Sequence, residues 1–398
     1  MKISIVSVAI SLILGLIAVS VPGVVTAADD AYELFNLLDS SDSRSLLKKY
    51  LTKDVFNLLI SYKTKYGGSL ADCIQSGCKN PESVCGIYAS DPDAYDTFSD
   101  VFDPIIRVYH NIAELKQPVP NFDISGVPFE DLDPDGHYIE SNRITVRRNL
   151  AKYGFPPTTT NEERKAIETM TVNALKALSG DLKGTYYPLP NMRQELYKPM
   201  AEVFPLAHDD PYMLSDILIY SLPLFVQLQN KNDYDVYFSE KRDADIYRDW
   251  PTGRGIFLND KKDFLVFLNE EDHLNIVSMQ IGGNVAAVWR KLNKGLVPLE
   301  KSLNFVHNPK LGYLTYSPTN LGTTLRISVR IRIPGLSKYT AKFNELCEEN
   351  HLHQEVIVDE VFEISNKRLM GLTEAQIYEE FMIGVKRIIA VEKLVTKG

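Results

Sequence analysis

The chain has 398 residues, of which 44% are hydrophobic and 24% charged, and its formal net charge is -9. This length is enough for two ordinary domains with large buried cores, and the composition is that of a globular protein. The negative net charge argues against a general binder of nucleic acid or anionic membranes, because both need an extended basic surface. An anion site must therefore be local and built by a few arginines.

The N-terminal segment, residues 1–27, has the pattern of a secretory signal peptide. Lys2 precedes a long apolar run, Pro22 and Gly23 follow it, and the segment ends in Val25-Thr26-Ala27. The pattern predicts cleavage after Ala27 and a secreted, extracellular protein with no membrane contact after cleavage. The alternative is an uncleaved anchor helix, since the apolar run is close to the length that spans a bilayer.

Residues 28–123 are expected to form a small all-α domain. Apolar residues recur at helical spacing in "SRSLLKKYLTKDVFNLL", from Leu46 to Leu59, with Ser43 as the expected N-cap. Four prolines between positions 118 and 134 make residues 113–140 a loop-rich connector and the expected domain boundary.

The cysteines are Cys73, Cys78, Cys85 and Cys347. In an oxidising compartment they could form two disulfides in any of three pairings, and the alternative is free buried thiols. The spacing of the first three suits zinc poorly and no histidine pair lies nearby, so no metal site is predicted.

Residues 139–397 are expected to form a larger domain of strands and helices. "NRITVRRN" alternates as a strand, and "DFLVFLNEED" predicts a buried strand that ends in acidic residues. Helices are predicted from Thr160 or Asn161 to Gly180 and from Asn284 to Gly295. The whole pattern predicts an α+β fold in which helices flank an antiparallel sheet.

The segment "TYSPTNLGTTLRISVRIRI" (315–333) contains a turn followed by a strict alternation. Its apolar face suits a core, whereas its other face carries Arg326, Ser328, Arg330 and Arg332. Arginine presents a planar fork that suits bidentate phosphate contacts. The chain contains neither G-x-x-x-x-G-K-[ST] nor G-x-G-x-x-G, so a P-loop or Rossmann site is excluded.

Five motifs together resemble one enzyme family. They are "GTYYPL" (184–189), "WPTGRGIF" (250–257), "FLVFLNEEDHL" (264–274), "GYLTYSPTNLGTT" (312–324) and "ISNKRLMGLTE" (364–374). From about residue 40 onward the chain resembles the ATP:guanidino phosphotransferases, or phosphagen kinases, and most of all their arginine kinase-like members. The resemblance implies a nucleotide, ATP or ADP with Mg²⁺, held by arginines on the sheet, and a guanidino substrate clamped between the domains.

The resemblance assigns roles to individual positions. It makes Glu271 the carboxylate that holds the guanidino substrate and places Ser317 where the family has a reactive cysteine. The expected phosphate ligands are Ser141, Arg143 and Arg326. Arg147 and Arg330 are added to them as replacement ligands on the same strand faces. For Arg147, Arg330 and Arg332 the alternative is pairing with acidic neighbours or facing solvent. The expected loop for the guanidino substrate comprises Ser83, Val84, Cys85, Gly86 and Tyr88.

The chain departs from the family pattern where the chemistry takes place. Thr145 and Asn275 stand at arginine positions, and residues 190–249 contain no clear counterpart of the adenine-stacking histidine. "HLHQEVIVDEVFE" (351–363) is too short for the family's mobile loop, which carries a phosphate arginine and a second catalytic glutamate. Each lost arginine removes about 4 kcal/mol of transition-state stabilisation if it is worth about 10³ in rate.

We therefore expect a secreted family homologue with impaired or absent phosphoryl transfer that retains binding of a nucleotide or a guanidino compound. If nucleotide binding is lost, no cofactor is expected; the sequence predicts no nucleic-acid partner and leaves a protein partner unknown. The first alternative is an active phosphotransferase with a rearranged set of arginines. The second is a structural or storage role in secretion.

Overall fold

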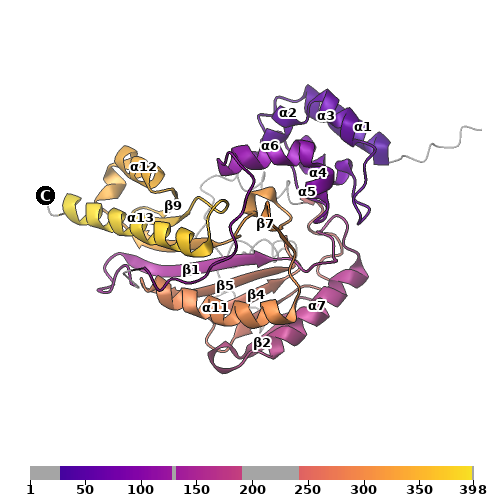
Figure 1. The fold of residues 1–398 in the computed structure, drawn as a ribbon. Coiled ribbons are helices and arrows are strands. Elements are labelled where there is room, and N and C mark those ends of the chain that lie inside the picture. The colour runs from indigo at the N-terminus through magenta and orange to yellow at the C-terminus, as the bar shows by residue number, and fades with distance from the viewer. Residues whose placement is uncertain (1–26, 128–130, 191–241, 397–398) are drawn as a thin grey trace, which may run out of the picture.

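A computed structural model describes residues 27–127, 131–190 and 242–396 of the chain. It consists of a helical N-terminal part and a larger part built on an antiparallel sheet flanked by helices (Figure 1), which confirms the predicted fold class. The predicted signal peptide, apart from its last residue, lies outside the described ranges. Within those ranges no helix combines the length and apolarity needed to cross a membrane.

The N-terminal part contains six helices within the described ranges. They are α1 (Ala27–Ser40), α2 (Leu46–Tyr50), α3 (Lys53–Leu59), α4 (Leu70–Lys79), α5 (Ala94–Thr97) and α6 (Ser99–His110). The continuous helix expected between Ser43 and Leu59 is wrong. Ser45 caps α2 and Thr52 caps α3, each accepting a backbone N–H with its hydroxyl, so the chain stops and restarts the helix at Thr52.

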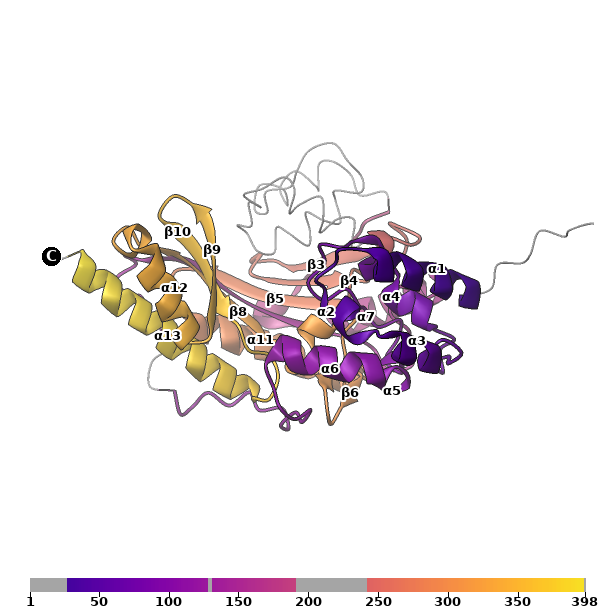
Figure 2. The same cartoon turned by 90° about the horizontal axis from the view of Figure 1, so that it is seen from above.

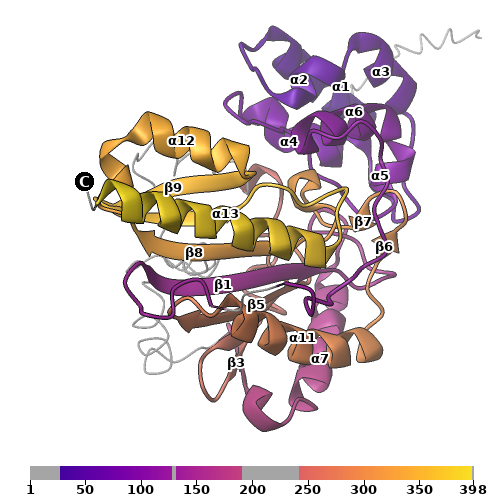
Figure 3. The ribbon, with the colours of Figure 1, turned by 60° about the vertical axis from the view of Figure 1, so that its left-hand side comes forward.

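The eight-stranded sheet has the order β2-β3-β4-β5-β1-β8-β10-β9, and all its neighbouring strands are antiparallel. The strands are β1 (Ile139–Arg148), β2 (Gly184–Pro188), β3 (Gly255–Asn259), β4 (Phe264–Leu268), β5 (Leu274–Ile281), β8 (Arg326–Arg332), β9 (Leu352–Val358) and β10 (Val361–Asn366). A separate hairpin pairs β6 (His307–Asn308) with β7 (Gly312–Tyr313). β1 lies in the middle of the sheet between β5 and β8, so its side chains are central (Figure 3).

Helices cover one face of this sheet (Figures 1 and 3). They are α7 (Asn161–Lys176), α11 (Val285–Ser302), α12 (Thr340–Glu349) and α13 (Glu374–Val395). Short 3₁₀ turns η1 (Gly180–Leu182), η2 (Pro318–Asn320) and η3 (Leu336–Lys338) complete the elements. The apolar residues of β1, β5, β8 and β10 pack against these helices in one large core.

The predicted start of α7 is confirmed, because Thr160 caps the helix in a capping box with Glu163. Its predicted end at Gly180 is wrong, because the helix ends at Lys176 and Gly180 begins η1. The predicted end of α11 at Gly295 is wrong, because the helix continues to Ser302. Gly295 marks a close contact instead: a Cβ there would lie 2.3 Å from Cζ of Phe264, so only glycine lets the helix approach β4 this closely.

The helical part shares its core with the sheet-bearing part. Its buried cluster contains the helix residues together with Leu314, Tyr316 and Leu321 from the turns that follow β7. In Figure 2 the six helices lie beside one end of the sheet. The connection matters for function, because it fixes the helical part against the segment that carries Ser317.

The four cysteines are free thiols, and all are buried. Cys73, Cys78 and Cys85 lie in the core of the helical part, whereas Cys347 lies in the core of the sheet. Burial raises the pKa of Cys73, Cys78 and Cys347 to about 12. Of the two expectations for the cysteines, the structure shows the free buried thiols.

Candidate active site

The turn that joins β4 to β5, residues 269–273, presents the acidic motif of the sequence. Asn269 has a φ of 54°, in the left-handed region that asparagine tolerates, and its N–H donates to the carbonyl of His273 at 2.9 Å. Its side-chain amide donates to the carbonyl oxygens of Arg164 (3.0 Å) and Gly253 (2.7 Å). Three hydrogen bonds therefore hold the turn in place and direct Glu271 and Asp272 over the end of β1.

Asp272 and His273 anchor this turn in the interior. Asp272 is buried, and its Oδ1 accepts hydrogen bonds from Asn149 Nδ2 at 2.6 Å and from the Tyr316 N–H at 2.9 Å. His273 Nδ1 accepts from the Leu150 N–H at 3.0 Å, so its Nε2 carries the proton and donates to the Gly154 carbonyl at 2.9 Å. Burial lowers the pKa of His273 to about 4, so the ring is neutral and structural.

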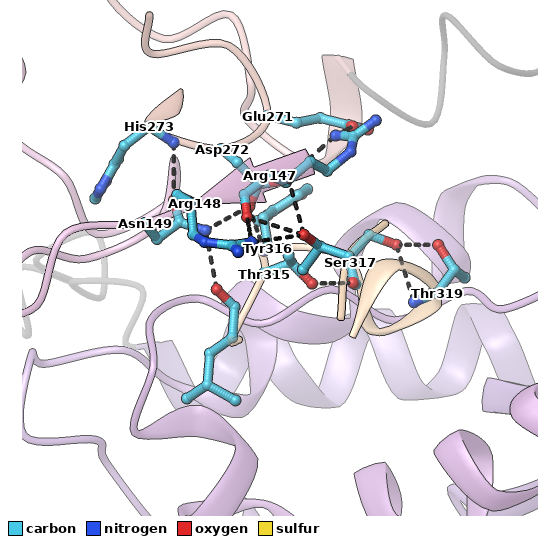
Figure 4. Close-up of polar contacts among 12 residues, drawn as sticks. Arg147, Arg148, Asn149, Glu271, Asp272, His273, Thr315, Tyr316, Ser317 and Thr319 are labelled. Atoms are coloured by element: carbon cyan, nitrogen blue, oxygen red, sulfur yellow. Dashed lines mark hydrogen bonds and ion pairs between the residues drawn. The ribbon is translucent and has the colours of Figure 1, made fainter. Parts of the chain in front are cut away.

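Glu271 lies at the predicted substrate position and is in contact with an arginine. The guanidinium of Arg147, from the end of β1, donates through Nη1 to Glu271 Oε2 and lies 3.3 Å from Asp272 Oδ2 (Figure 4). Burial raises the pKa of Asp272, although the positive charge of Arg147 opposes that rise. The structure therefore brings the predicted Arg147 and Glu271 together as an ion pair.

Ser317 lies in the turn that follows Tyr316. It is buried, it shares a hydrogen bond of 2.8 Å with the Thr319 hydroxyl, and its Oγ accepts from the Thr319 N–H at 3.4 Å. The hydroxyl thus caps η2, a role that a neutral side chain fills well. A hydroxyl does not provide the negative charge of a low-pKa thiolate beside a guanidinium.

The predicted substrate loop packs against the same turn. The carbonyls of Val84 and Cys85 accept hydrogen bonds from the first residues of α2, both at 3.0 Å. Tyr88 stacks on Tyr316, with ring centroids 4.9 Å apart and an interplanar angle of 12°. Gly86 has a φ of 78° and packs against Gly77, so a side chain fits at neither position. Ser83 is buried, whereas Val84 is 72% exposed at the surface of the loop.

The remaining predicted phosphate ligands lie on the same sheet face, further along the strands. Arg143 is buried and pairs with Glu363 of β10 at 2.7 Å. Arg330 and Arg332 lie 2.8 Å and 3.2 Å from Glu140, which is the acidic pairing considered as the alternative for them. Arg326 is exposed, and among the described residues it forms no ion pair.

A cavity of about 580 Å³ opens beside these arginines. Ser141, Arg143 and Arg330 contribute polar walls, and Met279 and Ile281 contribute apolar ones. Lys261 and Lys262 lie at its other side. The cavity and the Glu271 turn occupy two regions of one sheet face, so the predicted residues form two groups rather than one.

The two positions without arginine lie between these groups. Thr145 is directly opposite Arg326 across β1 and β8, and Asn275 is directly opposite Arg147 across β1 and β5. Arg147 is therefore the cross-strand neighbour of Asn275, the position at which the family resemblance predicts an arginine.

The segment 351–363 forms most of a tight hairpin. β9 and β10 pair directly, and the chain reverses at Asp359 and Glu360, with a φ of 45° at Asp359. The hairpin places Glu363 beside Arg143 and opposite Glu355.

Sequence reasoning missed Glu363, Glu140 and Tyr316 as members of the site. Strand alternation puts Glu363 on the arginine face of the sheet. Its ion pair is with Arg143 of β1, although the residue directly opposite it on β8 is Arg330. Residues 190–249, where the resemblance places the adenine-stacking histidine, lie mostly outside the described ranges. Within the described residues no group of three or more His, Cys, Asp or Glu side chains is arranged to hold a metal ion.

Comparisons with known proteins identify the family. The model of the ATP:guanido phosphotransferase C-terminal catalytic domain matches residues 166–395, and that of the N-terminal domain matches residues 41–107. An arginine kinase of Liolophura japonica is 46% identical over 92% of this chain and 99% of its own length. The arginine kinase Oct f 2 of Amphioctopus fangsiao is 43% identical over 91% and 99%.

Solved structures agree with these matches. The substrate-free duplicated taurocyamine kinase from Schistosoma mansoni superposes with a TM-score of 0.80 at 35% identity, covering 92% of this chain. This chain spans about half of that duplicated protein, 49% of its length. A lombricine kinase superposes with a TM-score of 0.77 at 30% identity, covering 89% of this chain and 94% of the other. The chain therefore belongs to the ATP:guanido phosphotransferase family, the phosphagen kinases.

Proposed function

We propose that this phosphagen kinase homologue is a secreted protein whose phosphoryl transfer is impaired or absent, and which binds a nucleotide with Mg²⁺ or a guanidino compound. One observation carries the proposal. Three of the candidate phosphate arginines are compensated by carboxylates of the chain itself: Arg143 by Glu363, Arg147 by Glu271 and Arg330 by Glu140.

Phosphoryl transfer depends on uncompensated positive charge. The protein contributes mainly positioning and cations around the migrating group, and each arginine is worth about 4 kcal/mol if it changes the rate by about 10³. A guanidinium already paired with a carboxylate supplies less field to a phosphate. Thr145 and Asn275 supply none, and the β9–β10 hairpin replaces the loop that would bring a further arginine and glutamate.

The cavity beside Arg143 fits a nucleotide. Its volume of about 580 Å³ lies in the range of small-molecule sites, and the apolar Met279 and Ile281 suit a base. Arg143 and Arg330 at the wall suit phosphate oxygens, with Lys261 and Lys262 as further cations. Mg²⁺ bound with the nucleotide would be held mainly by phosphates and would neutralise part of their charge.

The relatives favour a guanidino compound as the second ligand. They include arginine kinases, a taurocyamine kinase and a lombricine kinase. Glu271 and the loop 83–88 lie close to the same turn, as such a ligand requires. Secretion is supported by the pattern of residues 1–27.

A coupled assay with MgATP and L-arginine tests the proposal. We expect a kcat at least about 10³-fold below that of an active arginine kinase measured beside it, because at least two arginines are replaced. Titration calorimetry with MgADP should still detect binding, and that binding should weaken in Arg143→Ala. Turnover close to that of the active enzyme, abolished by Glu271→Gln, would instead support the active phosphotransferase with rearranged arginines.

A further inference from the structure

We propose that Arg147 is an internal guanidinium that occupies Glu271, and that it thereby excludes free guanidino compounds from this carboxylate. Arg147 would then be a specificity-determining residue of the site. The inference rests on the proposed function in one respect, the assignment of Glu271 as the carboxylate for a guanidino ligand.

The strand geometry delivers the guanidinium to Glu271. Arg147 is the last but one residue of β1 and lies opposite Asn275, four residues after Glu271 along the chain. Its side chain spans the short distance from the strand end to the turn and contacts Glu271 and Asp272 together (Figure 4). The structure thus shows directly that this pair of carboxylates binds a guanidinium.

The backbone of Arg147 is held on both sides. Its N–H donates to Thr324 Oγ1 at 3.0 Å, and its carbonyl accepts from Arg148 Nη1 at 2.8 Å and from Thr324 Oγ1 at 3.0 Å. The guanidinium is therefore attached at a fixed base. A group tethered in this way has an effective concentration of about a millimolar or more, which a weakly bound free guanidine must exceed to replace it.

Arg147 also reduces the negative charge of the site around Glu271. Glu271 is compensated by Arg147, Asp272 is committed to Asn149 and Tyr316, and Ser317 is neutral. A free guanidinium would therefore meet less negative charge at this place than Glu271 and Asp272 would present without Arg147. Removal of Arg147 restores the charge of Glu271 and the space beside it.

The alternative is that Arg147 and Glu271 form an ordinary ion pair without effect on ligands. Their side chains are 22% and 11% exposed, so the pair is only partly screened by solvent. Both interpretations predict a change in stability when Arg147 is replaced. Only the specificity role predicts a gain in ligand binding, so binding is the readout that separates them.

The test compares Arg147→Ala with the unsubstituted protein by calorimetric titration of L-arginine. We expect at least about tenfold tighter binding in the variant, since a charge-assisted contact to Glu271 becomes available. L-Citrulline, which is neutral in place of the guanidinium, should gain nothing. Adding Glu271→Gln to Arg147→Ala should remove the gain. Arg332→Ala, which removes an arginine elsewhere on the sheet but leaves Glu140 paired with Arg330, should show none.

Several outcomes would overturn the inference. They are a folded Arg147→Ala protein that binds L-arginine no better, an equal gain for L-citrulline, or a gain that survives Glu271→Gln. If the alanine variant is unstable, Arg147→Met replaces it in the test, because methionine keeps the apolar stem of the side chain. In both variants Asp272 retains its hydrogen bonds to Asn149 and Tyr316. Turnover and MgADP binding are measured separately, so failure of the proposed function is distinguishable from failure of this inference.

Discussion

At the scale of single residues, the acidic turn shows how burial decides what a titratable group does. In the sequence Asp272 and His273 are candidates for catalytic groups. In the structure both are buried and hydrogen-bonded to neighbouring residues. Glu271 has its ion pair with Arg147, a neighbour that a ligand could replace, and Arg147 also contacts Asp272. The reactive appearance of the motif therefore comes down to one carboxylate and the arginine beside it.

His273 provides a prediction on pH dependence. Burial lowers its pKa from 6.5 to about 4. As the pH falls, His273 is therefore protonated in the unfolded chain before it is protonated in the folded chain. Stability from this group is complete above pH 6.5 and is lost between about pH 6.5 and pH 4. The loss between pH 7 and pH 5 should be on the order of 2 kcal/mol.

Urea unfolding of the protein and of His273→Gln at pH 7, 6 and 5 measures this effect. Glutamine does not titrate, so the free energy of unfolding should depend less steeply on pH in the variant. Other groups that titrate in this range contribute to both curves and cancel in the comparison. If the free energies of unfolding of the two proteins depend equally on pH, then His273 has the same pKa in the folded and unfolded states, and the prediction is wrong.

At the scale of elements, the β9–β10 hairpin brings carboxylates onto the sheet. It places Glu363 beside Arg143, so that Glu363 compensates the charge of that arginine. The same pairing puts Glu355 directly opposite Glu363. Two carboxylates at directly paired positions repel each other, so the hairpin has a built-in electrostatic cost.

Relief of that repulsion should stabilise the protein. Burial, and next the charge of Glu363, raise the pKa of Glu355, so its ionised form is unfavourable in the folded state at pH 7. We expect Glu355→Gln to raise the free energy of unfolding by about 0.2–1 kcal/mol. Urea unfolding measures the change, with Glu349→Gln on the exposed side of α12 as the control.

That control should stay within about 0.5 kcal/mol of the unsubstituted protein. A loss of stability in Glu355→Gln would mean that its carboxylate has a favourable partner that outweighs Glu363. The difference in free energy of unfolding between Glu355→Gln and the unsubstituted protein should shrink as the pH is lowered. Protonation of Glu355 removes the same charge that the substitution removes.

At the scale of the whole molecule, the cysteines bear on the proposed secretion. Thiols in an oxidising compartment commonly form disulfides, whereas the four thiols of this chain are buried in two separate cores. Their depth, and for three of them the raised pKa, keeps them from the thiolate form that oxidation requires.

Mass spectrometry of protein from the medium of a secreting cell tests this. We expect a chain that begins at Ala28 and that carries four alkylated cysteines when it is unfolded in iodoacetamide without reductant. The native protein should react far more slowly. A mass short by two alkyl groups would reveal a disulfide, and retention of residues 1–27 would favour the anchor.

The sequence by itself determined the family, the two-part α+β fold and the two faces of β8, because motif identity and the alternation of side chains are local properties. It also predicts that the chain departs from the family pattern at Thr145, Asn275 and Ser317. Only the tertiary structure decided the partners. Arg147 pairs with Glu271 and Arg143 with Glu363, and the four cysteines form no disulfide with one another. Such pairings depend on strand register and on packing between residues more than 100 positions apart, which no local pattern encodes.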